Sequence, residues 1–407
     1  MTAFVIVGGG LAGAKAAEAL RDNGFEGSIV LFTAEEHLPY ERPPLSKEYL
    51  AGKKALADFT VDPADWYREH DVDLRRGVEV TTIDLAGHTV GTADGARQPY
   101  DKLLLATGSS ARRIPIPGAD AEGVHYLRTV DDADALLASL TDGATLAIVG
   151  AGWIGLEVAA SARDRGVAVT IVESAELPLL TLGREVAHIF AALHREHGVD
   201  LRLNASVSAI ATDGGKAIGI ELGDGSVVNA DAVLIAVGAK PNSELAQEAG
   251  LETAEGGVLV DSSLKTSDDD VYAVGDIAAA ENPLLGVRIR TEHWANAQKQ
   301  PVVAVAGMLG SPGVYDELPY FFTDQYDLGM EYVGHAPTYA QVVFRGDPRN
   351  QAKREFTAFW LDGGDRVLAG MNVNIWEGLD DIKSVIGSKR AVHPDLLADP
   401  EVPLTDC

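Results

Sequence analysis

The sequence predicts an α/β protein made of two similar units, followed by a smaller α+β domain. An apolar strand, a glycine-rich turn and an alanine-rich helix follow one another at residues 2–20, and the same succession returns at residues 144–162. From residue 318 onward, short apolar runs flank an Asp-Gly-Gly-Asp hairpin signal at 362–365 and precede a helical stretch at 375–388. These observations indicate two strand–turn–helix units and a separate domain of antiparallel strands and a helix.

Both glycine-rich turns have the spacing G-x-G-x-x-G, which is typical of Rossmann-like dinucleotide-binding domains. The first glycine permits a tight turn, the second lets a pyrophosphate approach the backbone, and the third lets the helix pack closely on the strand. The first amide groups of that helix then face the phosphates. The first turn contains Gly8, Gly10, Leu11, Ala12 and Gly13, and the second contains Gly150, Gly152, Trp153, Ile154 and Gly155.

Each unit also has a second apolar strand that ends in an acidic residue, the group that accepts hydrogen bonds from a ribose diol. In the first unit this strand ends in Glu35 and Glu36, and in the second it ends in Glu173. One such acid would usually do no more than end a strand, and one glycine turn is weak evidence. Two complete units in one chain predict that the protein binds two dinucleotides.

Glu173 also favours one nicotinamide cofactor over the other. A carboxylate at this position repels the additional phosphate of NADP, and residues 174–182 contain no Lys or Arg that would hold that phosphate. The sequence therefore predicts NAD(H) in the second unit.

Composition limits the other function classes. The 407 residues include 61 Asp and Glu against 33 Lys and Arg, and this net charge of −28 argues against nucleic acid as a partner. There is neither an apolar run of 18 residues nor a secretory leader, so we expect no membrane span and a cytoplasmic protein. The sequence leaves monomer and homodimer as alternatives. Cys407 is the only cysteine, which excludes an internal disulfide, a dithiol active site and a cysteine-based metal site. We expect no bound metal.

Three further motifs complete the pattern. Residues 100–109, YDKLLLATGS, form an apolar strand that ends in A-T-G, and residues 267–278, SDDDVYAVGDIA, form a strand that ends in G-D. Residues 40–47, YERPPLSK, contain two consecutive prolines, which are incompatible with a helix interior or a paired strand. They predict a rigid loop that carries a cation on either side of the prolines.

In this order, the motifs resemble those of the two-dinucleotide flavoprotein reductases, in which the first unit binds FAD and the second binds NAD(H). The proline loop is similar to that of the NADH:ferredoxin reductases of bacterial oxygenase systems, such as putidaredoxin reductase and biphenyl dioxygenase reductase. Apoptosis-inducing factor shares the loop. The resemblance covers essentially the whole chain, including YLRTVDDA at 126–133 and TEHWANAQKQ at 291–300.

The resemblance implies a particular division of the chain. A discontinuous FAD domain would comprise residues 1–110 and 240–317, and an NAD domain at 111–239 would be inserted between its halves. The C-terminal α+β domain, residues 318–407, would cover the flavin and present the surface for a partner.

The resemblance also assigns roles to the two cations of the proline loop. Arg42 would bind the FAD pyrophosphate, and Lys47 would lie beside the flavin ring near N5, paired with Glu157. A cation at that point stabilises the negative charge of the reduced flavin. Asp276, in the G-D motif, would hydrogen-bond the ribityl chain. The alternative for the loop is a rigid surface turn with solvated charges.

Other assignments that the resemblance implies are weaker. Arg128 would contact FAD, Val80 would contact the adenosine through its backbone, and Gly238 would lie over the nicotinamide. Groups around the flavin and nicotinamide rings fall at Glu292, His293 and Trp294. Trp294 is equally compatible with packing in the core.

The sequence departs from the family pattern at two positions. Ala34 replaces an acid, so that ribose recognition rests on Glu35 or Glu36. Phe322 stands where many relatives have a tryptophan, so that shielding of the flavin is expected to differ.

The resemblance implies that the protein takes hydride from NADH and passes electrons singly to a small iron–sulfur protein such as a [2Fe–2S] ferredoxin. Ferredoxins are usually acidic, and candidates for a basic docking patch are Arg288, Arg290 and Lys299, which are equally interpretable as solvated surface cations. Without a patch, rubredoxin, a quinone or oxygen would be alternative acceptors. A second alternative is an NADH-responsive redox sensor like apoptosis-inducing factor.

Overall fold

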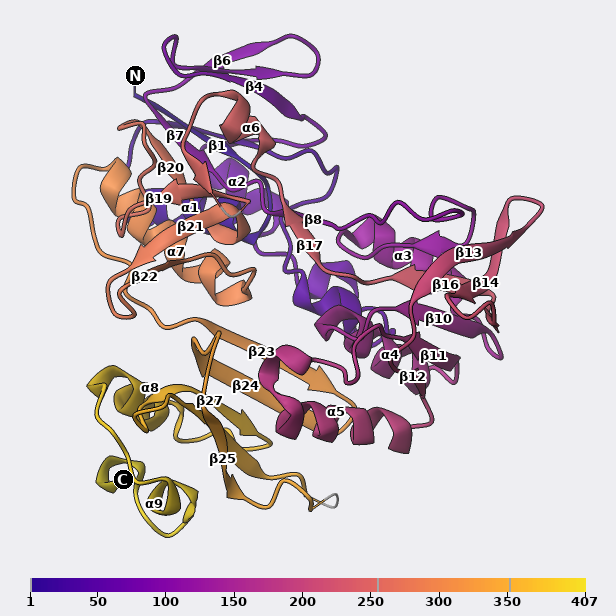
Figure 1. The fold of residues 1–407 in the computed structure, drawn as a ribbon. Helices are drawn as coiled ribbons and strands as arrows, with labels where there is room; N and C mark the ends of the chain where they lie inside the picture. Colours follow the sequence, from indigo (N-terminus) through magenta and orange to yellow (C-terminus); the bar gives the residue numbers. More distant parts are fainter. Residues whose placement is uncertain (1, 255, 351–352) are drawn as a thin grey trace. The chain divides into compact units, whose positions relative to one another are not determined.

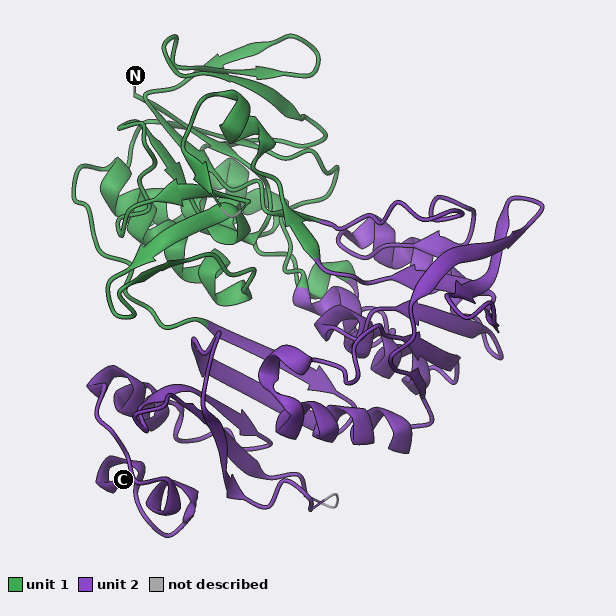
Figure 2. Cartoon of the chain, viewed as in Figure 1, with its two compact units in different colours: residues 1–42, 56–110, 239–319 green, residues 43–55, 111–238, 320–407 purple. Residues whose placement is uncertain are grey.

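The computed structural model describes residues 2–254, 256–350 and 353–407, and these form two compact units (Figure 2). Unit 1 comprises Met1–Arg42, Leu56–Ser110 and Ala239–Pro319. Unit 2 comprises Pro43–Ala55, Ala111–Gly238 and Tyr320–Cys407. The chain therefore passes several times between the units, and both are discontinuous in sequence.

The central sheet of unit 1 has five parallel strands in the order β20-β7-β1-β2-β3. Of these, β20, β7 and β1 are labelled in Figure 1. Its strands are β1 (Ala3–Val7), β2 (Ser28–Phe32), β3 (Val72–Arg75), β7 (Lys102–Leu105) and β20 (Val271–Ala273). Most of these strands are buried along nearly their whole length, as expected of a parallel sheet that is covered on both faces. Helices α1 (Leu11–Asp22) and α7 (Trp294–Met308) contact each other.

Unit 2 contains a second parallel sheet with the order β12-β11-β10-β16-β9. Its strands are β9 (Val124–His125), β10 (Thr145–Val149), β11 (Ala168–Val172), β12 (Asp200–Arg202) and β16 (Ala232–Ile235), and its helices are α3 (Val130–Ser139), α4 (Trp153–Asp164) and α5 (Arg184–Glu196). In each sheet the strand that precedes the glycine turn is central and pairs with the strand that follows the helix. The predicted duplication of one unit is confirmed.

The C-terminal part of unit 2 is an antiparallel sheet with the order β23-β24-β27-β26-β25. It consists of β23 (Tyr320–Gln325), β24 (Leu328–Gly334), β25 (Gln341–Gly346), β26 (Phe356–Leu361) and β27 (Val367–Val373), followed by α8 (Leu379–Ser388) and α9 (Pro394–Ala398). Trp360 is fully buried, and its indole N–H donates to the carbonyl of Leu182, 2.9 Å away. The strands and the helix predicted for the C-terminal domain are present. The predicted fold class, an α/β protein with a C-terminal α+β domain, is confirmed.

Shorter elements complete the two units. In unit 1 they are β4 (Val80–Asp84), β5 (Thr89–Thr92), β6 (Arg97–Pro99), β18 (Thr253–Ala254), β19 (Gly257–Val260), β21 (Ala278–Asn282), β22 (Val287–Ile289), α2 (Ala64–Glu69) and α6 (Glu244–Glu248). In unit 2 they are β13 (Val207–Asp213), β14 (Lys216–Leu222) and β15 (Val227–Asn229), which form an antiparallel sheet. Strands β8 (Ser109–Ala111) and β17 (Ala239–Pro241) pair with each other.

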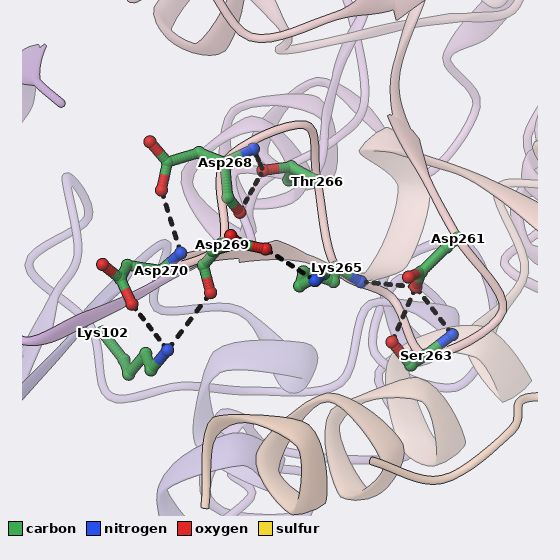
Figure 3. Close-up of polar contacts among 8 residues, drawn as sticks. All are labelled: Lys102, Asp261, Ser263, Lys265, Thr266, Asp268, Asp269 and Asp270. Carbon is green, nitrogen blue, oxygen red and sulfur yellow. Dashed lines mark hydrogen bonds and ion pairs between the residues drawn. The ribbon is translucent and has the colours of Figure 1, made fainter. Parts of the chain in front are cut away.

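A polar cluster fixes the register of β7 and β20, the two strands that lead into the A-T-G and G-D motifs (Figure 3). Lys102 Nζ lies 2.6 Å from a carboxylate oxygen of Asp270 and donates to the carbonyl of Asp269 at 3.1 Å. Lys265 Nζ lies 2.7 Å from the Asp269 carboxylate. Each lysine thus offsets part of the charge of the aspartate run, so that the start of β20 is tied to the start of β7.

In the described ranges, no helix is both long and apolar enough to span a bilayer.

Candidate active site

The first glycine turn joins β1 to α1 beside the A-T-G motif. Gly8 has a φ of +118°, and a Cβ atom there would lie 2.1 Å from the carbonyl oxygen of Ala106. A Cβ at Gly13 would lie 2.0 Å from the carbonyl oxygen of Gly8. Both positions therefore require glycine for the packing of the chain itself.

Gly10 differs from its two neighbours in the motif. Its φ of −84° is accessible to any residue, and no atom of the described chain lies within 4 Å of a Cβ placed on it. Packing within the protein thus gives no reason for a glycine at this position. A ligand that must approach the backbone closely, such as a pyrophosphate, gives one.

The second turn, between β10 and α4, repeats this arrangement. Gly150 has a φ of +101° and packs against Ala236, since a Cβ would lie 2.5 Å from its carbonyl oxygen. A Cβ at Gly155 would lie 2.2 Å from the carbonyl oxygen of Gly150. A Cβ at Gly152, however, would meet no described atom within 4 Å. Each unit therefore offers one open backbone position at the start of a helix, as dinucleotide binding requires.

The acids predicted to bind ribose lie beside these turns. In unit 1, Glu35 pairs with Arg42 at 2.8 Å and accepts a hydrogen bond from the Tyr40 hydroxyl at 2.5 Å. In unit 2, the carboxylate of Glu173 accepts the backbone N–H of Ala151, which belongs to the glycine turn, at 2.8 Å. Glu173 also accepts the N–H of Ala175 at 2.8 Å. Glu173 is therefore held against the turn of its own unit, and Glu35 is held by Tyr40 and Arg42.

Asp276 is buried at the carboxyl end of β20. Its carboxylate accepts a hydrogen bond from the Ser109 hydroxyl at 2.9 Å, and its backbone carbonyl accepts from Arg290 at 3.1 Å. The N–H of the preceding Gly275 donates to the side-chain oxygen of Gln300. The side chain is therefore fixed in one orientation, which suits a carboxylate that must hydrogen-bond the hydroxyl groups of a ligand.

Lys47 and Glu157 form a buried ion pair within unit 2. Lys47 Nζ lies 3.0 Å from Glu157 Oε1, and both side chains are less than a tenth exposed. Glu157 also accepts hydrogen bonds from the hydroxyl groups of Ser46, at 2.5 Å, and Thr323, at 2.6 Å. Each carboxylate oxygen thus has at least one donor, and additional hydrogen bonds of this kind are the condition under which a buried ion pair is tolerated.

The proline loop is fastened to α4 next to this pair. Residues Pro43–Ser46 form a 3₁₀ turn, and the hydroxyl of Ser161 donates to the carbonyl of Ser46 at 2.7 Å. Ser161 lies one helical turn beyond Glu157, on the same face of α4. The Lys47 ammonium lies 5.0 Å from the centre of the Phe322 ring, so that Phe322 also provides a cation–π contact.

Sequence reasoning missed Ser46, Ser161 and Thr323 as partners of this pair. Ser161 had a readable signal, because it follows Glu157 by four residues in a predicted helix. Thr323 had none, because 166 residues separate it from Glu157.

The remaining predicted site residues are divided between the two units. In unit 2, the backbone N–H of Arg128 donates to Asp132 at the start of α3. Gly238 has a φ of +105°, and within the described residues nothing lies within 4 Å of a Cβ there. In unit 1, Val80 begins β4, and Glu292 precedes α7. His293 is the N-cap of α7 and Trp294 is its first residue.

Each of the three cations considered for docking has a carboxylate partner in unit 1. Arg288 pairs with Glu281 at 2.6 Å, Arg290 pairs with Glu292 at 2.8 Å, and Lys299 pairs with Glu317 at 2.6 Å. Glu281 and Arg288 are directly opposite in the β21–β22 ladder. These three side chains do not by themselves make an excess of positive charge, because each is paired with a carboxylate.

The sequence matches two protein families over most of its length. Residues 2–301 match the family described as pyridine nucleotide-disulphide oxidoreductase, and residues 320–407 match the family described as reductase C-terminal. The ferredoxin–NAD(+) reductase component of the anthranilate 1,2-dioxygenase system of Burkholderia cepacia is 40% identical over 404 residues, which are 98% of each chain.

Two solved structures are similar over their whole length. The ferredoxin reductase of the CYP199A2 system from Rhodopseudomonas palustris has a TM-score of 0.94 and 33% identity, and the match covers 100% of this chain and 99% of that one. The covalent putidaredoxin reductase–putidaredoxin complex has a TM-score of 0.93 and 35% identity, covering 99% and 97% respectively.

Proposed function

The chain belongs to the pyridine nucleotide-disulphide oxidoreductase family, and we propose that it is an NADH-dependent reductase that delivers electrons to a small iron–sulfur protein such as a [2Fe–2S] ferredoxin. The observation that carries this proposal is the pair of glycine turns, each with an open second glycine beside its acid. The relative from Burkholderia cepacia bears the name of a ferredoxin–NAD(+) reductase component, and one similar structure is a covalent complex of putidaredoxin reductase with putidaredoxin.

The protein uses FAD and NAD(H), and the residues of the two units fit these groups. FAD, when bound, supplies a hydride acceptor and a source of single electrons. In unit 1 the open backbone at Gly10, the acid Glu35 and the cation Arg42 would hold it. Asp276 would accept hydrogen bonds from its polyol chain. In unit 2 Gly152 and Glu173 would hold NADH.

Lys47 would act on charge at the flavin ring. Hydride transfer needs no protein base, so the chain contributes by positioning the two rings and by stabilising the charge that develops. A lysine held by a buried carboxylate keeps its position without having to be ordered during the reaction. Glu157 orients Lys47, while Ser46 and Thr323 orient Glu157.

The other residues that the family resemblance singles out are also proposed to contact the two cofactors. We propose that Arg128 and Val80 contact FAD, that His293 and Trp294 lie near the flavin, and that Glu292 and Gly238 lie near the nicotinamide. The FAD domain would comprise residues 1–110 and 240–317, the NAD domain residues 111–239, and the C-terminal domain residues 318–407. We also propose that the protein works in the cytoplasm as a monomer or homodimer.

The family takes its name in part from enzymes that act on disulphides, which use a pair of cysteines. This chain has one cysteine and therefore no dithiol. Cys407 is buried, and burial raises the pKa of its thiol above the ordinary value. A thiol in such a setting is a weaker nucleophile at neutral pH. Reduction of disulphides is thus excluded as the activity.

Reduction of cytochrome c by NADH tests the proposed acceptor. We expect the rate to be low with the reductase alone, and to rise and saturate when a [2Fe–2S] ferredoxin is added. Arg288, Arg290 and Lys299 are each paired with a carboxylate, so they offer an acidic ferredoxin little attraction, and the net charge of −28 repels it. We therefore expect the rate not to fall as the ionic strength is raised. A rate that ferredoxin does not raise, together with rapid transfer to a quinone, a rubredoxin or oxygen, would contradict the assignment of the acceptor.

A further inference from the structure

A chain of hydrogen bonds extends from Glu157 on the side opposite its contact with Ser46. The Thr323 hydroxyl lies 2.6 Å from Glu157 Oε1, and Gln325 Nε2 donates to that hydroxyl at 3.2 Å. Gln325 Oε1 lies 2.9 Å from Nε2 of His194, and the hydroxyl of Tyr326 lies 3.3 Å from Nδ1 of the same ring. All of these residues belong to unit 2.

The chain is buried from Glu157 to His194, and Tyr326 at its far end is half-buried. His194 is 0% exposed, and Thr323 and Gln325 are each 1% exposed. A buried polar network of this kind is stabilising only if each of its members is satisfied, and its hydrogen bonds polarise one another. Three elements, α4, α5 and β23, contribute to it, so that it connects segments that are far apart in sequence.

Along this chain, each hydrogen bond is donated toward the Glu157 end. Burial lowers the pKa of His194 to about 4, so the imidazole is neutral near pH 7 and carries one proton. Because Gln325 Oε1 can only accept, that proton is on Nε2, and Nδ1 accepts from the Tyr326 hydroxyl. Gln325 then donates to Thr323, and Thr323 donates to Glu157. Every donor therefore points toward the carboxylate that holds Lys47.

The backbone at Tyr326 provides an independent indication. Tyr326 has a φ of +57° in the two-residue turn between β23 and β24, a position normally occupied by Asn, Asp or Gly. A tyrosine in this conformation is unfavourable and persists when its surroundings hold it there. Here its ring stacks on His197, with centroids 3.7 Å apart, and its hydroxyl reaches His194.

We propose that Tyr326, His194, Gln325 and Thr323 are positioning residues, which act through Glu157 on Lys47 and so raise the reduction potential of the flavin. This inference depends on the proposed function, because it requires Lys47 to act on bound FAD. The donors withdraw negative charge from the Glu157 carboxylate. Lys47 therefore presents more of its positive charge to the reduced flavin than it would beside an unassisted carboxylate.

The test compares flavin midpoint potentials in Thr323→Val, Thr323→Ser and the wild type by dye-coupled redox titration of the holoprotein. Valine keeps the shape of threonine but removes the donor. We therefore expect the equilibrium constant for flavin reduction to fall about tenfold, which lowers the midpoint potential by about 30 mV for a two-electron couple. Serine retains the hydroxyl and should restore most of the wild-type potential. Thr357→Val is the matched control, since Thr357 is also buried in the C-terminal sheet but donates to Asn372, 2.9 Å away.

A second measurement does not depend on flavin. In protein labelled with ¹⁵N-histidine, the resonances of His194, identified by their loss in His194→Gln, should show a neutral ring protonated at Nε2 between pH 6 and 8. A ring protonated at Nδ1 would overturn the direction of the chain and with it the proposal.

The results distinguish a failure of the proposed hydrogen-bond chain from a failure of the proposed reductase function. If the wild type is yellow and is bleached by NADH, but Thr323→Val has the same midpoint potential as the wild type and Thr357→Val, the inference is wrong and the function stands. If the wild type does not bind FAD, the proposed function is wrong, and the inference falls with it.

Discussion

Gly10→Ala should weaken FAD binding about 100-fold or more while the protein remains folded. The added methyl group meets nothing in the described chain, but it occupies the space through which a pyrophosphate would approach the backbone. A 100-fold loss corresponds to about 2.7 kcal/mol. The free energy of unfolding of the apoprotein should change by no more than about 1 kcal/mol, which is the cost of alanine at a helix N-cap. Flavin titration by fluorescence quenching and thermal melting of the apoprotein measure the two effects.

Two other glycines serve as controls for this prediction. Gly152→Ala places the same methyl group in the second turn, so we expect normal FAD content but a large loss of NADH binding. Gly8→Ala should instead destabilise the protein, because its φ is +118° and its Cβ would collide with Ala106. If Gly10→Ala bound FAD normally, or if Gly152→Ala lost FAD rather than NADH, the assignment of the turns would be wrong.

Lys47→Met should slow the reduction of the flavin by NADH about 100-fold. The loss of a charge that is fixed near the point where charge develops typically has an effect of this size. Stopped-flow absorbance near 450 nm follows the reaction directly. Because the single substitution leaves Glu157 buried without its cation, the double variant Lys47→Met/Glu157→Gln should recover stability but not rate.

Lys53→Met is the matched control. Lys53 lies six residues beyond Lys47, and its ion pair with Asp164 is exposed. An exposed pair of this kind contributes little, so we expect both rate and stability to stay near those of the wild type. A Lys47→Met protein that is reduced at the wild-type rate would remove Lys47 from the mechanism.

The parts of the fold that could be predicted are those that short-range backbone constraints specify. Gly8 and Gly150 require positive φ, and each stands between an apolar strand and a helix, so each turn can be recognised without any knowledge of the rest of the chain. The C-terminal sheet was predictable for a similar reason, because the hairpin signal at 362–365 lies between two apolar runs. The short strands β18 and β22 carry no such signal.

The parts that could not be predicted depend on contacts between distant segments. The hydroxyl of Thr323 is 166 residues from Glu157 in sequence, and Gln325 is 131 residues from His194. Alternation along β23 places Thr323 and Gln325 on one face, but it does not say which helix they meet. The neutral pairing of Arg288 with Glu281 follows from the register of a hairpin that the sequence does not mark clearly.

Anaerobic titration of the purified protein with NADH tests most directly whether the chain binds a flavin that NADH reduces. We predict a yellow protein with an absorbance band near 450 nm that is bleached in proportion to the NADH added, with an end point at one NADH for each flavin. A protein that remains colourless after refolding with FAD, or a flavin band that excess NADH leaves unchanged, would contradict it.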